Sequence, residues 1–453
     1  MHADVIVIGS GQAGVPLATR LAAAGKTVLL AERGDLGGTC VNVGCTPTKT
    51  MMASARAAHV ARTAGRLGVH TGEVRVDLAA VVDRKDGIVQ RWREGVAKRL
   101  KAERLTLLRG HARFTGERRI EVAGEAHTAD TVIINVGARP VVPKIDGLAQ
   151  VPFLDNASVM RLRELPSHLI VLGGGYIGCE FGQMFRRFGA RVTLVDHNPH
   201  LMSREDDEIS AALEKAFQAE GIDLALGAKV AGVSAAAGEV RVRLEDRELR
   251  GSHLLVATGR RANTDDLGCD KAGVALDDKG CVIADDHYKT SAAGVYAVAD
   301  VLGGPQFTHT SWDDHRLLFD LLLGRGTRGR AGRHIPYTAF TDPQVAGVGL
   351  TEKEARKRGI AFEVASMPFG NIARAIELDE TAGMMKLLID PATERILGAA
   401  ITGAEAGELI HLFVALMQAG APARAIVDAQ MVHPTFAEGV QSLVMKLDRY
   451  RLK

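Results

Sequence analysis

Two cysteines lie five positions apart in Gly37-Gly38-Thr39-Cys40-Val41-Asn42-Val43-Gly44-Cys45-Thr46-Pro47-Thr48-Lys49, with glycines before and between them. A disulfide needs Cα atoms about 4.4–6.8 Å apart, and a short loop that contains Gly44 can close that gap. Pro47 suits the first position of a helix, so Cys45 is expected just before a helix that continues over residues 50–62. The positive end of this helix and the nearby Lys49 favour a thiolate. The pair is a candidate redox centre, with an inert disulfide or half of a zinc site as the alternatives.

A glycine-rich turn follows the first apolar run of the chain. Residues 4–8 have the composition of a buried parallel strand, a helix is expected up to residue 24, and a second strand over 27–31 ends at Glu32. Glycines in such a turn let the backbone approach a pyrophosphate at the helix N-terminus, and the acid can bind a ribose. This order of elements favours dinucleotide binding over an ordinary tight turn. The glycines are Gly9, Gly11 and Gly14.

The same pattern occurs again in the middle of the chain. A strand over 168–172 precedes a glycine turn, a helix is expected up to residue 188, and a strand from residue 191 ends at Asp196. Two complete patterns in one chain predict two dinucleotide-binding regions, which is much stronger evidence than either pattern alone. The glycines of the second turn are Gly173, Gly175 and Gly178.

Composition limits the class of protein. A length of 453 residues suggests about three domains of roughly 150 residues each, and a hydrophobic fraction of 46% is ample for their cores. The net charge of +2 gives no general attraction to nucleic acid or to acidic membranes. Five cysteines do not form the framework of a small secreted protein, and the N-terminus lacks a signal-like apolar core. We expect a cytoplasmic protein with no nucleic-acid or membrane partner.

The cysteine motif and the two glycine patterns resemble those of the flavin-containing pyridine nucleotide-disulfide oxidoreductases, the family of dihydrolipoamide dehydrogenases, glutathione reductases and mercuric reductases. Residues 254–261, 294–300 and 433–438 resemble further family segments, in family order along the chain. The resemblance implies an α/β fold with two Rossmann-like domains, for FAD and NAD(P), and a C-terminal α+β dimerisation domain. The implied segments are 1–147 (FAD), 148–264 (NAD(P)), 265–333 (FAD, returning) and 334–453 (dimerisation).

The resemblance also implies where the two cofactors bind. FAD is assigned to the first domain because that domain carries the thiols, and NAD(P)H is assigned to the second. Asp196 favours NADH because a carboxylate repels a 2′-phosphate, although Arg204 is near enough to keep NADPH open. Family members commonly have glycine where this chain has Ala299, an exchange that is tolerable unless the backbone there needs a positive φ. The implied cofactor-binding residues are Gly9, Gly11, Gly14, Glu32, Thr39, Lys49, Ala112, Gly137, Asp300, Thr308, Gly173, Gly175, Gly178, Asp196 and Gly259.

The catalytic residues follow from the same resemblance. Cys45 would be the thiolate next to the flavin, and Cys40 would attack the outside substrate. His433, oriented by Glu438, would act as acid and base toward the partner subunit's thiols in a homodimer with shared sites. Lys49 and Glu180 match a family pair beside the flavin.

Two segments around residue 320 have simpler interpretations. Thr310 or Ser311 is expected to cap a helix whose first turn contains two acids. No metal site is expected there, because residues 313–315 are consecutive and do not share one helix face. Residues 324–333, rich in Gly and Arg, are interpreted as a solvated linker.

The sequence defines the electron acceptor less closely than it defines the cofactors. The resemblance implies an FAD-dependent NAD(P)H oxidoreductase that passes electrons through Cys40 and Cys45 to a small molecule: a disulfide, a metal ion or a thiol-reactive oxidant. Gln12 and Thr19 stand where glutathione reductases carry Ser and Arg, which argues against glutathione. Residues 45–50 and 307–314 look most like the mercuric reductase-like branch, but no cysteine pair follows Cys281 to deliver mercury. The alternatives are a dihydrolipoamide dehydrogenase, and an NADH oxidase or quinone reductase with regulatory cysteines.

Overall fold

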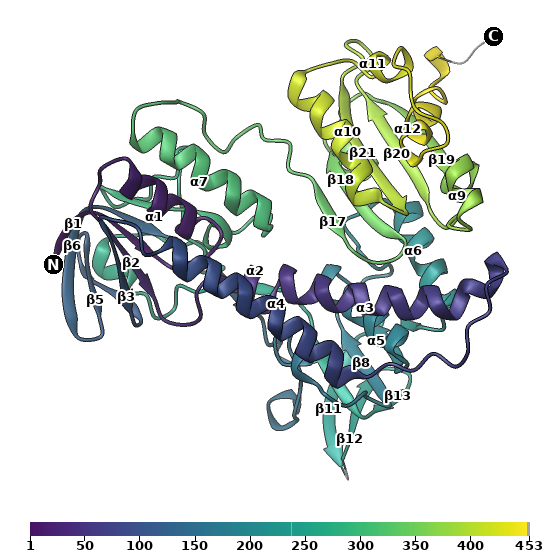
Figure 1. Ribbon diagram of the computed structural model, residues 1–453, viewed down its shortest axis with the longest axis horizontal. Helices are drawn as coiled ribbons and strands as arrows, with labels where there is room; N and C mark the ends of the chain where they lie inside the picture. Colours follow the sequence, from purple (N-terminus) through teal and green to yellow (C-terminus); the bar gives the residue numbers. More distant parts are fainter. Residues whose placement is uncertain (237, 451–453) are drawn as a thin grey trace. The chain divides into compact units, whose positions relative to one another are not determined.

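The computed structural model describes residues 1–236 and 238–450, so the last three residues of the predicted 334–453 segment lie outside the described part. The chain divides into two units, each assembled from separate stretches of sequence (Figure 1). Unit 1 consists of Met1–Met51, Ala79–Val141 and Gly259–Arg333. Unit 2 consists of Met52–Leu78, Val142–Thr258 and the chain from His334 onward.

Unit 1 is built on a sheet whose central strands are parallel. The strand order is β3-β2-β1-β6-β5-β4, and β16 pairs in parallel with the end of β6. The apolar run after Ala3 forms β1, a central strand whose apolar side chains are buried in a core on each face of the sheet. The strands are β1 (His2–Ile8), β2 (Val28–Glu32), β3 (Leu105–Arg109), β4 (Ala112–Gly116), β5 (Arg119–Val122), β6 (Glu125–Ile134) and β16 (Val295–Ala297). A separate antiparallel pair joins β7 (Ala138–Pro140) to β15 (Arg260–Ala262).

Helices cover one face of this sheet. Figure 1 shows α1 and α7 lying together over it, and leucines of both helices share one apolar core with the strands. The opposite face packs on the β4–β5 hairpin and on residues 262–282. The helices are α1 (Gly14–Ala23), α2 (Gly38–Val43), α4 (Leu78–Arg99), α7 (Thr308–Leu322) and the start of α3 (Cys45–Thr63).

Unit 2 contains the second parallel sheet, in the order β10-β9-β8-β14. The predicted strand over 168–172 and the helix ending at residue 188 are confirmed, and α5 packs against β8 and β9. A three-stranded antiparallel sheet, β11-β12-β13, adjoins this part. The elements are β8 (His168–Leu172), α5 (Tyr176–Phe188), β9 (Arg191–Val195), α6 (Asp207–Ala219), β10 (Asp223–Ala225), β11 (Val230–Ala236), β12 (Glu239–Leu244), β13 (Glu248–Gly251) and β14 (His253–Val256).

The C-terminal part of unit 2 is an antiparallel sheet in the order β17-β18-β21-β20-β19. Alternate residues of β20 and β21 face α10 and α12, while Lys386 and Thr402 contact residues at the start of α6. Figure 1 shows α10 crossing β18 and β21. The elements are β17 (Tyr337–Ala339), β18 (Gln344–Gly349), α8 (Glu352–Lys357), β19 (Glu363–Pro368), α9 (Ala373–Glu377), β20 (Met384–Ile389), β21 (Ile396–Gly403), α10 (Ala406–Ala419), α11 (Arg424–Val427) and α12 (Phe436–Val444).

Two local expectations are wrong. Cys45 does not precede the helix but is the first residue of α3, so the helix begins two residues before Pro47. The helix predicted to be capped by Thr310 or Ser311 starts already at Thr308, and its first turn contains no acid. Most of the stretch 324–333 is exposed, as expected of a solvated linker, but Arg333 at its end is 11% exposed and pairs with Asp313 and Asp314.

None of the described helices combines the length and apolar character of a membrane-crossing segment.

Candidate active site

The two cysteines of the motif lie on consecutive helices of unit 1. Cys40 belongs to α2 and Cys45 opens α3, with Gly44 between the helices. A Cβ at Gly44 would come within 2.8 Å of the Thr39 carbonyl oxygen, so glycine permits this close turn. The two side chains are hydrogen-bonded to each other, and this contact, together with burial, raises the pKa of Cys40. The spacing in the sequence therefore does bring the two sulfurs together.

Thr308, the first residue of α7, completes this cluster. Its Oγ1 atom lies 3.2 Å from Cys45 Sγ. Cys45 is exposed and Cys40 is half-buried. The start of α7 and the start of α3 thus converge on one sulfur atom, and Thr308, predicted only as a cofactor residue, lies beside the thiols.

Both predicted glycine turns have the form of a phosphate cradle. A Cβ at Gly178 would lie 1.8 Å from the Gly173 carbonyl oxygen, so this glycine is required by packing. Gly175 differs, because a Cβ there would meet nothing within 4 Å and its φ is −80°. Neither packing nor conformation demands glycine at this position, which leaves space for a ligand. Neither α1 nor α5 has a side-chain cap from the described residues, so both N-termini suit a pyrophosphate.

The two acids that follow these turns already accept hydrogen bonds from the turns. Glu32 accepts bonds from the backbone and hydroxyl of Ser10, at 2.9 and 2.7 Å. Asp196 accepts a 2.5 Å bond from the Gly174 N–H and a 2.7 Å bond from the Asn198 N–H. These contacts fix each carboxylate beside its glycine turn, where a ribose of a bound dinucleotide would need it.

Ala299 and Asp300 form a sharp turn after β16. Ala299 has a φ of 68°, so this position does need the left-handed conformation that glycine adopts without cost. Asp300 is half-buried and pairs with Arg260 at 2.7 Å, and its partial burial raises the pKa of its carboxyl group. A half-buried acid with one cationic partner can also bind a hydroxyl group of a ligand, so the residues present fit a flavin.

His433 and Glu438 meet at the start of α12 in unit 2. The Nδ1 atom of His433 lies 2.9 Å from Glu438 Oε2. Thr435 caps the helix by accepting a bond from the Glu438 N–H, which places the carboxylate one turn inside the helix and opposite the imidazole. His433 is 70% exposed, so the acid–base face of its ring is open to a reacting group.

The other predicted site residues occupy defined positions in the two units. Lys49 follows Cys45 by four residues in α3, so the two side chains lie on one helix face. Glu180 is buried and accepts a 2.9 Å bond from the Phe340 N–H. The pairing of Lys49 with Glu180 stays a prediction. The remaining positions are Thr39 on α2, Ala112 at the start of β4, and Gly137 and Gly259 with φ of 67° and 130°.

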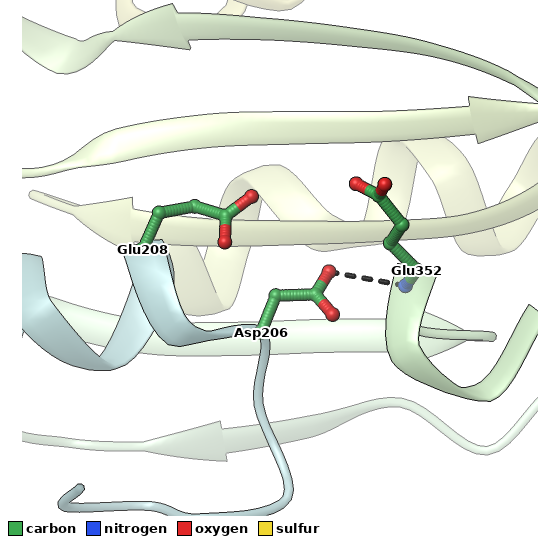
Figure 2. Close-up of side chains that lie close together, drawn as sticks. All are labelled: Asp206, Glu208 and Glu352. Atoms are coloured by element: carbon green, nitrogen blue, oxygen red, sulfur yellow. Dashed lines mark hydrogen bonds between the residues drawn. The ribbon is translucent and has the colours of Figure 1, made fainter. Parts of the chain in front are cut away.

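One acidic cluster was not predicted. Figure 2 shows Asp206, Glu208 and Glu352 gathered from the start of α6 and the start of α8, and their oxygens lie within 4.8 Å of one another. The ammonium group of Lys386 lies among them, 3.0 Å from Asp206, 2.6 Å from Glu352 and also bonded to Glu208. The lysine supplies the cation, so the cluster has the character of a buried ion-pair network rather than a metal centre.

Sequence reasoning missed the residues that support these groups. Arg260 lies in a predicted family segment, but the sequence does not predict it as the partner of Asp300. Tyr337 is not among the predicted site residues, although its hydroxyl bonds to buried Glu205 at 2.6 Å. The pairs are 40 and 132 residues apart in the chain, and no local pattern connects them.

Comparison with known proteins agrees with this geometry. Residues 3–314 match the pyridine nucleotide-disulphide oxidoreductase family, and residues 335–444 match its dimerisation domain. The chain is 34% identical over 450 residues to the probable pyridine nucleotide-disulfide oxidoreductase RclA of Escherichia coli K12, covering 97% of this chain and 98% of that protein. It is 36% identical to a dihydrolipoyl dehydrogenase of Thermus scotoductus, covering 98% and 97% of the two chains. It is 33% identical to a mercuric reductase of Staphylococcus aureus, covering 98% and 82%.

A solved structure extends the likeness to the fold. The Cu(II) complex of the HOCl-induced flavoprotein disulfide reductase RclA from Escherichia coli superposes with a TM-score of 0.90 at 33% identity, covering 98% of this chain and 99% of that one. The expected fold class of two dinucleotide-binding domains and a dimerisation domain is confirmed at the level of the family. The chain belongs to the pyridine nucleotide-disulphide oxidoreductases, which are flavoprotein enzymes that use FAD and NAD(P)H.

Proposed function

We propose that Cys40 and Cys45 form the redox centre of this flavoprotein, alternating between a disulfide and a pair of thiols. The contact between the two side chains, next to Thr308, is the observation that carries the proposal. Bound FAD would supply two-electron exchange between the nicotinamide and this sulfur pair.

The two sulfurs differ in how they hold a proton. The raised pKa of Cys40 keeps its proton in place, because the adjacent Cys45 and burial both disfavour a second negative charge. Cys45, at the start of α3, is stabilised as a thiolate by the positive end of the helix. We therefore assign Cys45 to the cofactor side and Cys40 to the attack on the acceptor.

Cys40 needs a base to become a nucleophile. His433 is the candidate, because its exposed imidazole is oriented by Glu438 through Nδ1 and leaves Nε2 open. It would take the Cys40 proton and later return a proton to the leaving group. In this proposal, His433 reaches the thiols of the partner subunit, so the enzyme is a homodimer with shared active sites, in line with its dimerisation domain.

The residues that would hold the cofactors follow from the two turns. We assign the turn of Gly9, Gly11 and Gly14 with Glu32 to FAD, together with Asp300. The turn of Gly173, Gly175 and Gly178 is assigned to NAD(P)H. Asp196 is fixed beside this turn and favours NADH, since its charge opposes a 2′-phosphate.

The acceptor we propose is a small molecule that reacts with thiols. RclA is described as an HOCl-induced flavoprotein disulfide reductase with a Cu(II) complex, and another relative is a mercuric reductase. A soft metal ion or a thiol-reactive oxidant suits a pair of adjacent sulfurs. A pair that cycles through the thiol form also suits the reducing cytoplasm, where we place the protein.

Differential alkylation tests the redox centre. Holoenzyme is labelled anaerobically before and after addition of NADH, and labelled cysteines are identified by mass spectrometry. Cys40 and Cys45 should become labelled only after NADH, while buried Cys179 and Cys269 serve as internal controls. Equal labelling of the pair with and without NADH would refute the assignment.

A substrate panel then separates the acceptors. Turnover of lipoamide, Cu(II), Hg(II) and hypochlorous acid-derived oxidants is compared in the parent enzyme and in Cys40→Ser. The preferred acceptor should be reduced fastest and should lose turnover in the variant. Preference for lipoamide would favour the dihydrolipoyl dehydrogenase alternative, which the 36% identical relative supports.

A further inference from the structure

Ala299 is held in a conformation that its side chain disfavours. Its φ of 68° lies in the left-handed region, which alanine adopts only at a cost in free energy. The residue stands directly before Asp300, so its conformation sets the direction in which the Asp300 carboxylate leaves the chain. Something in the surrounding structure has to stabilise this turn.

A buried carboxylate of α7 provides that stabilisation. Asp314 is 1% exposed, and its Oδ2 atom accepts a 2.8 Å hydrogen bond from the Ala299 N–H. Its other oxygen, Oδ1, accepts a 2.9 Å bond from the Tyr288 hydroxyl and a 2.8 Å bond from Arg333. Tyr288 and Arg333 thus hold one oxygen of the Asp314 carboxylate in place, and the other oxygen binds the turn at Ala299.

Each partner of Asp314 is well placed to hold it. Tyr288 is fully buried, and burial and the Asp314 charge raise the pKa of its hydroxyl, which stays protonated and donates. Arg333 is 11% exposed and supplies the counter-charge. Neither partner belongs to the residues assigned to cofactor or acceptor, so the network has no use in the proposed chemistry except through the turn.

We propose that Asp314 is a positioning residue that holds Ala299 in the left-handed conformation and thereby aims Asp300 at the cofactor. The inference rests on the proposed function, in which Asp300 binds FAD. It also explains how this chain keeps alanine at a position where a glycine would need no tether.

The isosteric variant Asp314→Asn isolates this effect. The amide of asparagine has only one acceptor oxygen. This oxygen can accept a bond either from the Ala299 N–H or from Tyr288 and Arg333, and the amide NH₂ group then faces the remaining donors, from which it cannot accept a bond. We expect the rate of FAD release from the holoenzyme, measured by flavin fluorescence after ultrafiltration, to rise about tenfold. Asp313→Asn is the matched control, because Asp313 contacts Arg333 and Arg316 but not Ala299.

A second substitution tests the mechanism itself. Glycine adopts the left-handed conformation without a tether, so Ala299→Gly added to Asp314→Asn should restore slow FAD release. A merely structural role of Asp314 would leave release fast in the double variant. Release that stays slow in Asp314→Asn, or that is not rescued by glycine, would overturn the inference.

Asp300→Ala separates this inference from the function on which it rests. Fast FAD release in Asp300→Ala with slow release in Asp314→Asn would overturn the positioning role and leave the assignment of Asp300 intact. Slow release in Asp300→Ala would overturn the assignment of Asp300 and the positioning role with it. Fast release in both single variants, with rescue by Ala299→Gly in the Asp314→Asn background only, is the expected result.

Discussion

Replacing Lys386 by methionine should reveal how strongly the stability of unit 2 depends on the ion pairs of Lys386 with Asp206, Glu208 and Glu352. Methionine has nearly the length and volume of the lysine stem, so the substitution removes the ammonium group without opening a large cavity. The side chain of Lys386 is 3% exposed, and its three acidic partners come from α6 and α8. The variant therefore leaves carboxylates together with no cation between them.

The size of the loss follows from the exposure of each partner. Removing one member of a buried ion pair costs about 3–5 kcal/mol. Glu208 is 46% exposed and can turn toward water, whereas Asp206 and Glu352 are 4% and 19% exposed. Two carboxylates remain confined, so we expect Lys386→Met to lower the free energy of unfolding by about 3 kcal/mol at pH 7.

The pH dependence provides a second check with a definite sign. The Lys386 ammonium lowers the pKa of Glu352, so this part of the stability is present above the unfolded pKa and is lost as the pH falls through the lower folded value. Urea unfolding followed by circular dichroism should show the largest difference between parent and variant at pH 7, and this difference should shrink progressively as the pH falls below about 4.5. A difference that persists at low pH would refute the electrostatic explanation.

Two controls sharpen this experiment. Glu208→Gln removes only the exposed partner and should cost less than about 1 kcal/mol. Millimolar Ca²⁺ should raise the unfolding midpoint of Lys386→Met but not that of the parent, because the three carboxylates can bind a divalent cation once the lysine is gone. A variant as stable as the parent at pH 7 would show that the cluster contributes nothing.

Three further predictions concern single groups. Burial raises the pKa of Glu205 to about 7, so the folded protein holds a proton that the unfolded chain releases. The free energy of unfolding should therefore fall by up to about 3 kcal/mol as the pH rises from 4.5 to 7. Glu205→Gln keeps the bond to Tyr337 and should flatten this pH dependence, measured by urea unfolding at pH 5 and pH 8. His433→Gln should lower the steady-state rate of acceptor reduction about 10²–10⁴-fold and leave the NADH-dependent exposure of the two thiols, measured by stopped-flow labelling, unchanged. An equal loss of acceptor reduction and of thiol exposure would contradict the acid–base role. Asp196→Asn should raise kcat/KM for NADPH relative to NADH by about tenfold, measured with both coenzymes, and an unchanged ratio would show that Asp196 does not select the coenzyme.

The elements that sequence reasoning predicted well are those with local signals. The strand at 168–172 and the helix ending at Phe188 agree with expectation because apolar runs, glycine turns and chain breaks lie within a few residues of each other. The predicted cap of α7 at Thr310 or Ser311 is wrong because the true start of this helix has no local signal. Phe307 precedes the helix and offers no capping side chain, so no residue type marks the boundary.

The supporting contacts of the site could not be predicted in the same way. Lys386 stands in a β-strand whose alternation would direct it toward water, but α6 covers that face and supplies a partner 178 residues away. Asp314 likewise depends on residues 15, 19 and 26 positions away, each from a different segment. Such pairs are set by tertiary packing, and a single sequence holds no pattern that connects them.

The pairing of β16 with β6 has a consequence for synthesis of the chain. The end of β6, residues 132–134, has an open edge until residues 295–297 leave the ribosome. At about 5–20 residues per second, the 160 residues between them take roughly ten to thirty seconds to translate. During that time an apolar strand with unpaired backbone groups is present on the nascent chain, so efficient production should depend on chaperones that shield this edge. Fragments that end before residue 295 should accordingly aggregate instead of accumulating as folded flavin-binding units.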